Sequence, residues 1–85
     1  MSKPVCAIVG VGAGNGESFS RKFAAEGYQV AMLARNIDYL QKLSQEIPSA
    51  KAYQYDVTEI DKTAEVFSKI ESEMGKVSVL VYNAG

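Results

Sequence analysis

Short runs rich in apolar residues alternate with segments of helical periodicity along the 85 residues of the chain. Such runs predict strands buried in a sheet, whereas apolar residues spaced three or four apart predict amphipathic helices. The predicted strands are 5–9, 29–34, 51–55 and 77–82. The predicted helices are 17–26, 37–47 and 58–74. This alternation favours one α/β domain with a parallel sheet, right-handed crossovers and helices on both faces.

Residues that start or stop helices stand at the ends of these helical segments. Asn36 precedes the second segment, where its side chain is suited to cap the helix. Gly27 and Gly75 follow the first and third segments, and glycine is the residue that most readily adopts the left-handed stop. Thr58 and Asp61 have the spacing of a capping box, which predicts that the third helix opens at Thr58.

The bulky apolar residues of the helical segments are predicted to face the core. They are Phe19, Phe23, Phe67 and Met74. Cys6, the single cysteine, lies inside the first apolar run, and we expect it to be a core residue rather than a reactive thiol. One cysteine forms no internal disulfide, which fits a reducing compartment.

Charge and composition narrow the classes of function. Nine basic and ten acidic residues give a net charge of −1 without a basic stripe, which argues against nucleic acid or an anionic membrane as a partner. The apolar runs are far shorter than the ~20 residues of a membrane span, and no signal peptide is recognisable, so we expect a cytoplasmic protein. The absence of histidine excludes Ser-His or Cys-His catalysis, and we expect no metal site.

A glycine-rich segment separates the first predicted strand from the first predicted helix. Gly10, Gly14 and Gly16 fit the spacing G-x-x-x-G-x-G, whereas G-x-G-x-x-G and the P-loop pattern do not fit. Glycine lets a loop turn sharply and bring its backbone N–H groups to a phosphate at the positive end of a helix dipole. We therefore expect these glycines, with Asn15, to hold a dinucleotide pyrophosphate; the alternative is a flexible turn without a ligand.

Three further features stand at the ends of the predicted strands: Arg35 after the second, Asp56-Val57 after the third and Asn83-Ala84-Gly85 after the fourth. Together with the glycine motif they resemble the cofactor-binding half of the short-chain dehydrogenase/reductase family. The resemblance extends over the whole chain and implies an NAD(P)-binding Rossmann half-domain spanning residues 1–85. Its expected order is β-α-β-α-β-α-β, with strands arranged 3-2-1-4 as half of a doubly wound sheet.

The resemblance also implies roles for the motifs after the third and fourth strands. The side chain of Asp56 would meet the adenine ring, Asn83 would tie strands together, and the backbone at Asn83-Ala84-Gly85 would lie along the cofactor ribose. The chain departs from the family pattern at Val9, where threonine is usual, and at Asn15, where isoleucine or leucine is usual. Neither departure removes a glycine, so we expect binding to survive.

The end of the second strand bears on the choice of cofactor. NAD-binding units usually carry an acid there for the ribose hydroxyls, but here Ala34 at the end of the strand is followed by Arg35 and Asn36. Arg35 could form charge-assisted hydrogen bonds to a 2′-phosphate, with help from Asn36, which favours NADP over NAD. Ala13 stands at the family's other position for a phosphate-binding base, and the alternative for Arg35 is a solvated side chain paired with Asp38.

The catalytic set of the family is a Tyr-x-x-x-Lys pair with a serine, and no tyrosine of this chain is followed by lysine at that spacing. We therefore expect no catalytic residue within 1–85. The chain is predicted to be the NADP(H)-binding portion of an oxidoreductase that transfers hydride to or from a carbonyl or alcohol in the complete enzyme. Two alternatives stay open: a non-catalytic nucleotide-binding or assembly module, and one piece of a cleaved enzyme.

The fourth predicted strand bears on assembly. In the order 3-2-1-4, segment 77–82 lies at the edge of the sheet with unpaired backbone groups. We expect this edge to bring about self-association or complementation by another strand.

Overall fold

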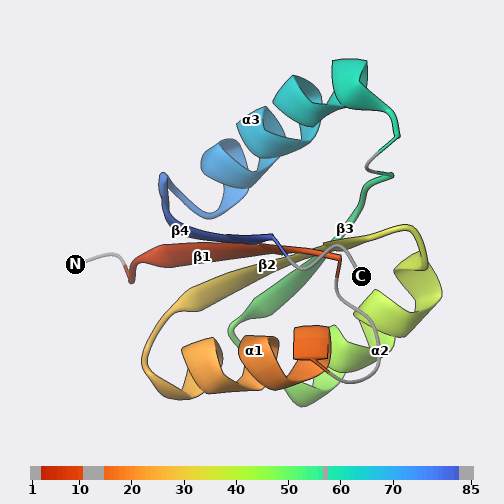
Figure 1. Cartoon of the computed structure of the whole chain (residues 1–85). Coiled ribbons are helices and arrows are strands. Elements are labelled where there is room, and N and C mark those ends of the chain that lie inside the picture. Colours follow the sequence, from red (N-terminus) through yellow and green to blue (C-terminus); the bar gives the residue numbers. More distant parts are fainter. Residues whose placement is uncertain (1–2, 11–14, 57, 83–85) are drawn as a thin grey trace.

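The computed structural model describes residues 3–10, 15–56 and 58–82. These residues form a four-stranded parallel sheet with helices on both faces (Figure 1). The strands are β1 Val5–Val9, β2 Gln29–Ala34, β3 Ala50–Gln54 and β4 Val77–Tyr82. The helices are α1 Asn15–Ala25, α2 Ile37–Glu46, the short 3-10 helix η1 Ile60–Lys62 and α3 Thr63–Glu73. The strand order β3-β2-β1-β4 confirms the predicted Rossmann-like topology.

The central strand β1 separates two hydrophobic cores. Helices α1 and α2 cover one face of the sheet and α3 covers the other (Figure 1). Cys6 and Ile8 of β1 face the core beneath α1 and α2, whereas Val5, Ala7 and Val9 face the core beneath α3. Because side chains alternate along a strand, a strand covered on both faces must be apolar at every position. The five residues of β1 are accordingly all buried.

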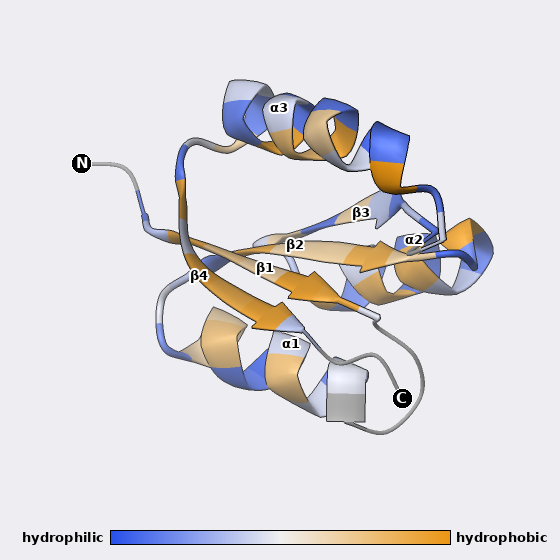
Figure 2. Cartoon of the chain, turned by 45° about the horizontal axis from the view of Figure 1, so that its top comes forward, coloured by the Kyte–Doolittle hydropathy of each residue, from blue (hydrophilic) through white to orange (hydrophobic). Residues whose placement is uncertain are grey.

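Figure 2 shows the two cores as hydrophobic colour along the strands and on the sides of the helices that face the sheet.

The thiol of Cys6 is fully buried in the core beneath α1 and α2, and burial raises its pKa to about 11. Since the thiolate is the reactive form of cysteine, this confirms Cys6 as a core residue. None of the helices in the described ranges has the length and apolar character needed to cross a membrane.

Predicted helix boundaries are confirmed at Asn36, at Gly27 and at Gly75, which follows the end of α3 with a φ of 114°. The Oδ1 atom of Asn36 accepts a hydrogen bond of 3.2 Å from the backbone N–H of Tyr39, which caps α2. Gly27 follows α1 with a φ of 95°, a left-handed conformation that costs glycine little because it has no Cβ. Gly27 therefore lets the chain leave α1 and enter β2.

The predicted start of the third helix at Thr58 is wrong. The backbone N–H and the hydroxyl of Thr58 both donate to Oδ1 of Asp56, at 2.9 and 2.7 Å, so the hydroxyl is engaged by the preceding carboxylate instead of a helix. One turn of 3-10 helix follows, and α3 begins at Thr63. Asp side chains often form such turns with the backbone two residues on, and here the turn delays the helix.

The prediction that Phe19 faces the core is also wrong, whereas Phe23, Phe67 and Met74 pack against the two cores. The side chain of Phe19 is 37% exposed, and its neighbour Ser20 is fully buried instead. The hydroxyl of Ser20 donates to the carbonyl of Gly16 at 2.9 Å, which satisfies its polar atom inside the protein. Adjacent helix residues are rotated by about 100°, so turning Ser20 inward moves Phe19 away from the sheet.

Strand β4 lies at the edge of the sheet, as predicted. Among the described strands it pairs only with β1. Leu80 and Tyr82 are 57% and 63% exposed, although their partners in the register, Ala7 and Val9, are buried beneath α3. The α3 side of β4 is therefore left without cover at these two positions.

Candidate functional site

The carboxyl ends of the parallel strands all lie at one end of the described sheet. In open α/β sheets, ligands bind in the crevice outside the carboxyl ends of the strands. Three residues predicted from the sequence follow these ends directly or closely: Gly10 after β1, Arg35 after β2 and Asp56 after β3. Because β2 pairs in parallel with both β1 and β3, these three positions lie at the same end of the sheet.

The turn after β1 begins at Gly10. Its φ of 87° lies in the left-handed region, and its N–H donates to the carbonyl of Leu33 in β2 at 2.8 Å. A residue with a Cβ would be strained there, so glycine is needed for the backbone conformation itself. Gly16 is buried in the first turn of α1, where its carbonyl accepts the hydrogen bond from Ser20.

Helix α1 begins at Asn15, near the same carboxyl end of the strands. The first N–H groups of a helix lack partners within it, and they coincide with the positive end of the helix dipole. This arrangement suits an anion. Several predicted site residues lie outside the described residues and stay predictions: Gly14, Val57, Asn83, Ala84 and Gly85. The side chain of Asn15 is likewise not described.

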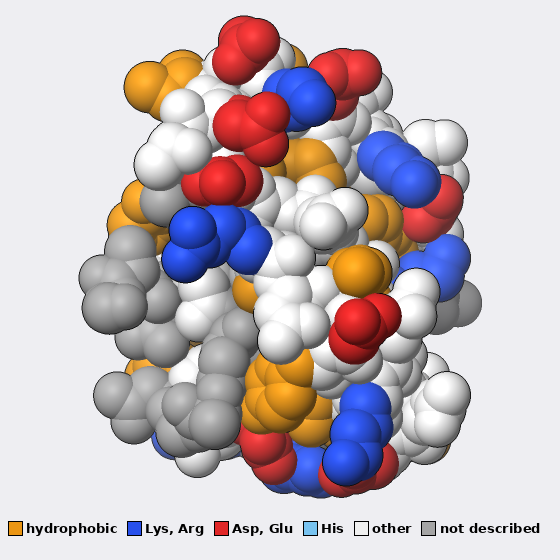
Figure 3. All heavy atoms as spheres, turned by 90° about the vertical axis from the view of Figure 1, so that its right-hand side faces the viewer, with side chains coloured by type: hydrophobic (Ala, Val, Ile, Leu, Met, Phe, Trp, Pro, Cys, Tyr) orange, Lys and Arg blue, Asp and Glu red, His pale blue; other side chains and the backbone are white. Residues whose placement is uncertain are grey.

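An open hollow of about 560 Å³ lies between the ends of β2 and β3 and the start of α3. Its lining residues are Arg35, Gln54, Tyr55, Asp56, Glu59, Lys62, Glu65, Val66 and Lys69. Figure 3 shows the carboxyl-end face of the molecule, with acidic and basic side chains intermixed over the α3 part. Within the described ranges, no three His, Cys, Asp or Glu side chains gather as a metal site would require.

Part of this lining was not predicted from the sequence. Lys62, Glu65 and Lys69 belong to none of the motifs, yet they line the hollow. Their spacing of three and four residues places them on one side of the helix, which is the signal that could have found them. Only the packing of α3 shows that this side borders the ends of β2 and β3.

Asp56 and Arg35 face this hollow from neighbouring strands. The two hydrogen bonds from Thr58, first the backbone N–H and then the hydroxyl, lower the pKa of the Asp56 carboxyl, and the positive charge of Arg35 lowers it further. The carboxylate is therefore ionised at neutral pH. Both bonds from Thr58 go to Oδ1, and among the described residues none donates to Oδ2, the oxygen that could accept from a ligand.

The backbone at Arg35 is fastened to β3. The side chain of Gln54 donates to the carbonyl of Arg35 at 3.3 Å, and the N–H of Tyr55 donates to the carbonyl of Ala34 at 2.9 Å. The side chain of Arg35 itself is exposed, and among the described residues no ion pair joins it to Asp38. The guanidinium is thus carried on a fixed backbone toward solvent, where it can meet an anion.

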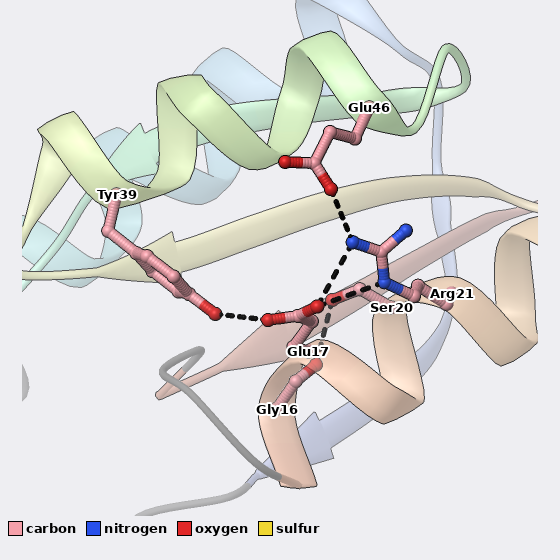
Figure 4. Close-up of polar contacts among 6 residues, drawn as sticks. All are labelled: Gly16, Glu17, Ser20, Arg21, Tyr39 and Glu46. Atoms are coloured by element: carbon pink, nitrogen blue, oxygen red, sulfur yellow. Dashed lines mark hydrogen bonds and ion pairs between the residues drawn. The ribbon is translucent and has the colours of Figure 1, made fainter.

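A polar network that was not predicted from the sequence connects α1 to α2 (Figure 4). The hydroxyl of Tyr39 donates to Oε1 of Glu17 at 2.6 Å, and Nε of Arg21 donates to Oε2 at 3.0 Å. Arg21 also donates to Oε1 of Glu46 at 2.6 Å. The hydrogen bonds from Tyr39 and Arg21 lower the pKa of Glu17, while burial and the bond to Glu17 raise the pKa of Tyr39 to about 12.

Several known proteins are similar to this chain in sequence or in fold. The family model of the short chain dehydrogenases matches residues 4–85. Carbonyl reductase family member 4 of Xenopus laevis is 33% identical over 85 residues, which cover 100% of this chain and 36% of that protein. The 3-oxoacyl-acyl-carrier-protein reductase FabG of Thermotoga maritima is 35% identical over 85 residues, which cover 95% of this chain and 35% of that protein.

Two solved structures contain the same arrangement of strands and helices. A variant of the actinorhodin polyketide ketoreductase with NADPH has a TM-score of 0.91 at 26% identity, covering 100% of this chain and 35% of its own. A metagenomic short-chain oxidoreductase in complex with NADP has a TM-score of 0.90 at 28% identity, covering 100% of this chain and 40% of its own. The chain spans about a third of the length of the curated relatives. Because the family match extends over nearly all of its residues, the chain belongs to the short chain dehydrogenase family.

Proposed function

We propose that the chain is an NAD(P)-binding half-domain that takes NADP(H) in preference to NAD(H), as the cofactor-binding portion of an oxidoreductase. One observation carries the preference: the exposed side chain of Arg35 follows β2 directly and borders the hollow, where an NAD-binding unit would have an acid. An acid there would repel a 2′-phosphate, whereas a guanidinium attracts it.

The pyrophosphate is proposed to lie against the turn after β1. Gly10 allows the sharp turn after β1, and Gly16 keeps the first turn of α1 compact. The start of α1 offers backbone N–H groups to the phosphate oxygens. Gly14 and Asn15 would complete this cradle. The proposal also keeps Asn83, Ala84 and Gly85 along the ribose and Val57 beside the adenine.

The adenosine end is proposed to lie in the hollow that Arg35 and Asp56 border. Oδ2 of Asp56 can accept a hydrogen bond from the amino group of adenine, and Arg35 can pair with the 2′-phosphate. Because Oδ1 of Asn36 accepts the capping bond, the amide nitrogen of Asn36 is the atom to donate to that phosphate. The relatives crystallised with NADPH and NADP support this assignment of the cofactor.

The reaction proposed for the complete enzyme is hydride transfer to or from a carbonyl or alcohol. When bound, the cofactor would donate the hydride to a carbonyl in its reduced form or accept it from an alcohol in its oxidised form, and the residues of this chain would bind and orient the dinucleotide. The names of the carbonyl reductase and 3-oxoacyl reductase relatives support a carbonyl substrate. The groups that hold the substrate and move the proton are proposed to lie outside residues 1–85, and a purely nucleotide-binding module is the alternative.

Calorimetric titration of the chain with NADPH and with NADH tests the proposed function. We expect NADPH to bind about tenfold more tightly, since a charge-assisted pair contributes about 1.5–3 kcal/mol and part of this is lost to ordering of the side chain. Equal affinities, or tighter binding of NADH, would contradict the preference for NADP(H). Binding of neither dinucleotide would contradict the proposal as a whole.

The edge of β4 supports a second proposal, that the chain associates with a further strand or with another copy of itself. Leu80 and Tyr82 leave apolar surface on a strand that, among the described strands, is paired on one side only, a combination that favours pairing between edges. In analytical ultracentrifugation at micromolar concentration, we expect the chain to sediment as a dimer or a larger oligomer. Leu80→Lys should shift it toward the monomer, whereas Ile60→Lys, at an 80% exposed position outside β4, should not. A monomer at all concentrations would refute self-association.

A further inference from the structure

The network between α1 and α2 has its central hydrogen bond next to the proposed cofactor site. Tyr39 lies in the first turn of α2 and Glu17 in the first turn of α1, and their 2.6 Å bond is partly buried. Figure 4 shows Glu17 between Tyr39 on one side and Arg21 on the other. Both carboxylate oxygens of Glu17 have donors, because Oε1 accepts from Tyr39 and Oε2 from Arg21.

Both ends of this bond adjoin residues proposed to hold the cofactor. Glu17 directly follows Gly16, in the helical turn assigned to the pyrophosphate. At the other end, the backbone N–H of Tyr39 donates to Oδ1 of Asn36, the residue after Arg35. A chain of hydrogen bonds therefore runs from the start of α1 to the loop that carries the guanidinium.

The negative charge of Glu17 makes its hydrogen bond to Tyr39 important for a phosphate bound nearby. A carboxylate in the first turn of a helix is favourable for the helix dipole but repels a phosphate bound at the same end. The donors Tyr39 and Arg21 hold the carboxylate between α1 and α2 and partly offset its charge, and Glu46 in turn holds Arg21. An unfastened Glu17 side chain could rotate toward the phosphates.

We infer that Tyr39 is a positioning residue for the dinucleotide, whose hydroxyl fixes the start of α1 relative to the loop of Arg35 and Asn36. The inference rests on the proposed function. A single NADPH molecule spans both places, with its pyrophosphate at α1 and its 2′-phosphate at Arg35. Fixing them in advance removes an ordering cost that binding would otherwise carry.

The test is calorimetric titration of Tyr39→Phe, which keeps the ring and removes the hydroxyl. We expect the variant to bind NADPH about three- to tenfold more weakly than the wild type. The loss should be smaller for NADH, which has no 2′-phosphate to span to. Tyr28→Phe removes a hydroxyl outside this network from a ring that packs on Phe23, so it serves as the matched control and should bind like the wild type.

A double-mutant cycle separates positioning from general stability. In an Arg35→Ala background, the effect of Tyr39→Phe on NADPH affinity should fall below about twofold, because the anchor that it positions is gone. Glu17→Gln, which keeps an oxygen for Tyr39 to donate to, should retain most of the affinity. Circular dichroism checks that each variant is folded.

Equal NADPH affinity of Tyr39→Phe and the wild type would overturn the inference and leave the proposed function standing. Equal losses for NADPH and NADH, unchanged by Arg35→Ala, would also overturn it, because they would indicate a structural role only. Binding of neither dinucleotide by the wild type would overturn the proposed function and this inference with it.

Discussion

Replacing Arg35 with alanine is expected to weaken NADPH binding about ten- to hundredfold and to change NADH binding less than about threefold. The side chain of Arg35 is exposed after β2, while Gln54 holds the carbonyl of Arg35 and Tyr55 holds that of the preceding Ala34, so the substitution removes a charge without disturbing the strands. The affinity lost is that of the contact with the 2′-phosphate, which only NADPH carries. Isothermal titration calorimetry with both dinucleotides measures the two effects separately.

Two variants control the measurement at Arg35. Arg35→Lys keeps the charge but loses the planar pair of donors, so its NADPH affinity should lie between those of the wild type and Arg35→Ala. Lys42→Ala removes an exposed positive charge from α2, outside the residues that line the hollow, and should leave both affinities within about twofold. Unchanged NADPH affinity in Arg35→Ala would show that Arg35 is only a solvated surface residue.

Ile70→Ala is expected to lower the free energy of unfolding by about 2–5 kcal/mol. The side chain of Ile70 is fully buried in the core beneath α3, next to β1 and β2. A chain of this length has a total stability of roughly 4–13 kcal/mol, so the loss takes up a large part of it. Since α3 also supplies the lining of the hollow, we expect NADPH affinity to fall as the helix loosens.

Ile60→Ala is the matched control for Ile70→Ala, because it makes the same substitution at a side chain that is 80% exposed in η1. It should change the free energy of unfolding by less than about 0.5 kcal/mol. Urea unfolding followed by circular dichroism measures both variants. If they unfolded at the same urea concentration, α3 would not be anchored to the sheet through Ile70.

Features that depend on neighbours a few residues away were predictable from the sequence. Asn36 caps α2 because its partner is the N–H three residues later, and Gly27 ends α1 because its left-handed conformation is a local property. Cys6 was expected in the core because every residue around it is apolar, as a strand covered on both faces requires. The predicted strand order came from the family resemblance of the motifs at the strand ends.

Features that depend on competing partners were not predictable in the same way. Thr58 has the spacing of a capping residue, but its hydroxyl is bound by Asp56, which the capping pattern does not take into account. Phe19 fits the helical periodicity, yet the rotation of α1 on the sheet places Ser20 inward. A hydrophobic stripe defines the inward side of a helix only broadly. Rotating α1 by one residue is therefore enough to bury Ser20 in place of Phe19.

By itself, the sequence determined the alternation of strands and helices, the glycine at the turn after β1, and the arginine in place of an acid after β2. These are properties of periodicity and of single backbone positions. Only the tertiary structure decided that Asp56 and Arg35 border one hollow with α3, and that Tyr39 meets Glu17 across 22 positions of sequence. Such meetings depend on strand register and on the rotation of each helix against the sheet, which arise from packing between distant segments.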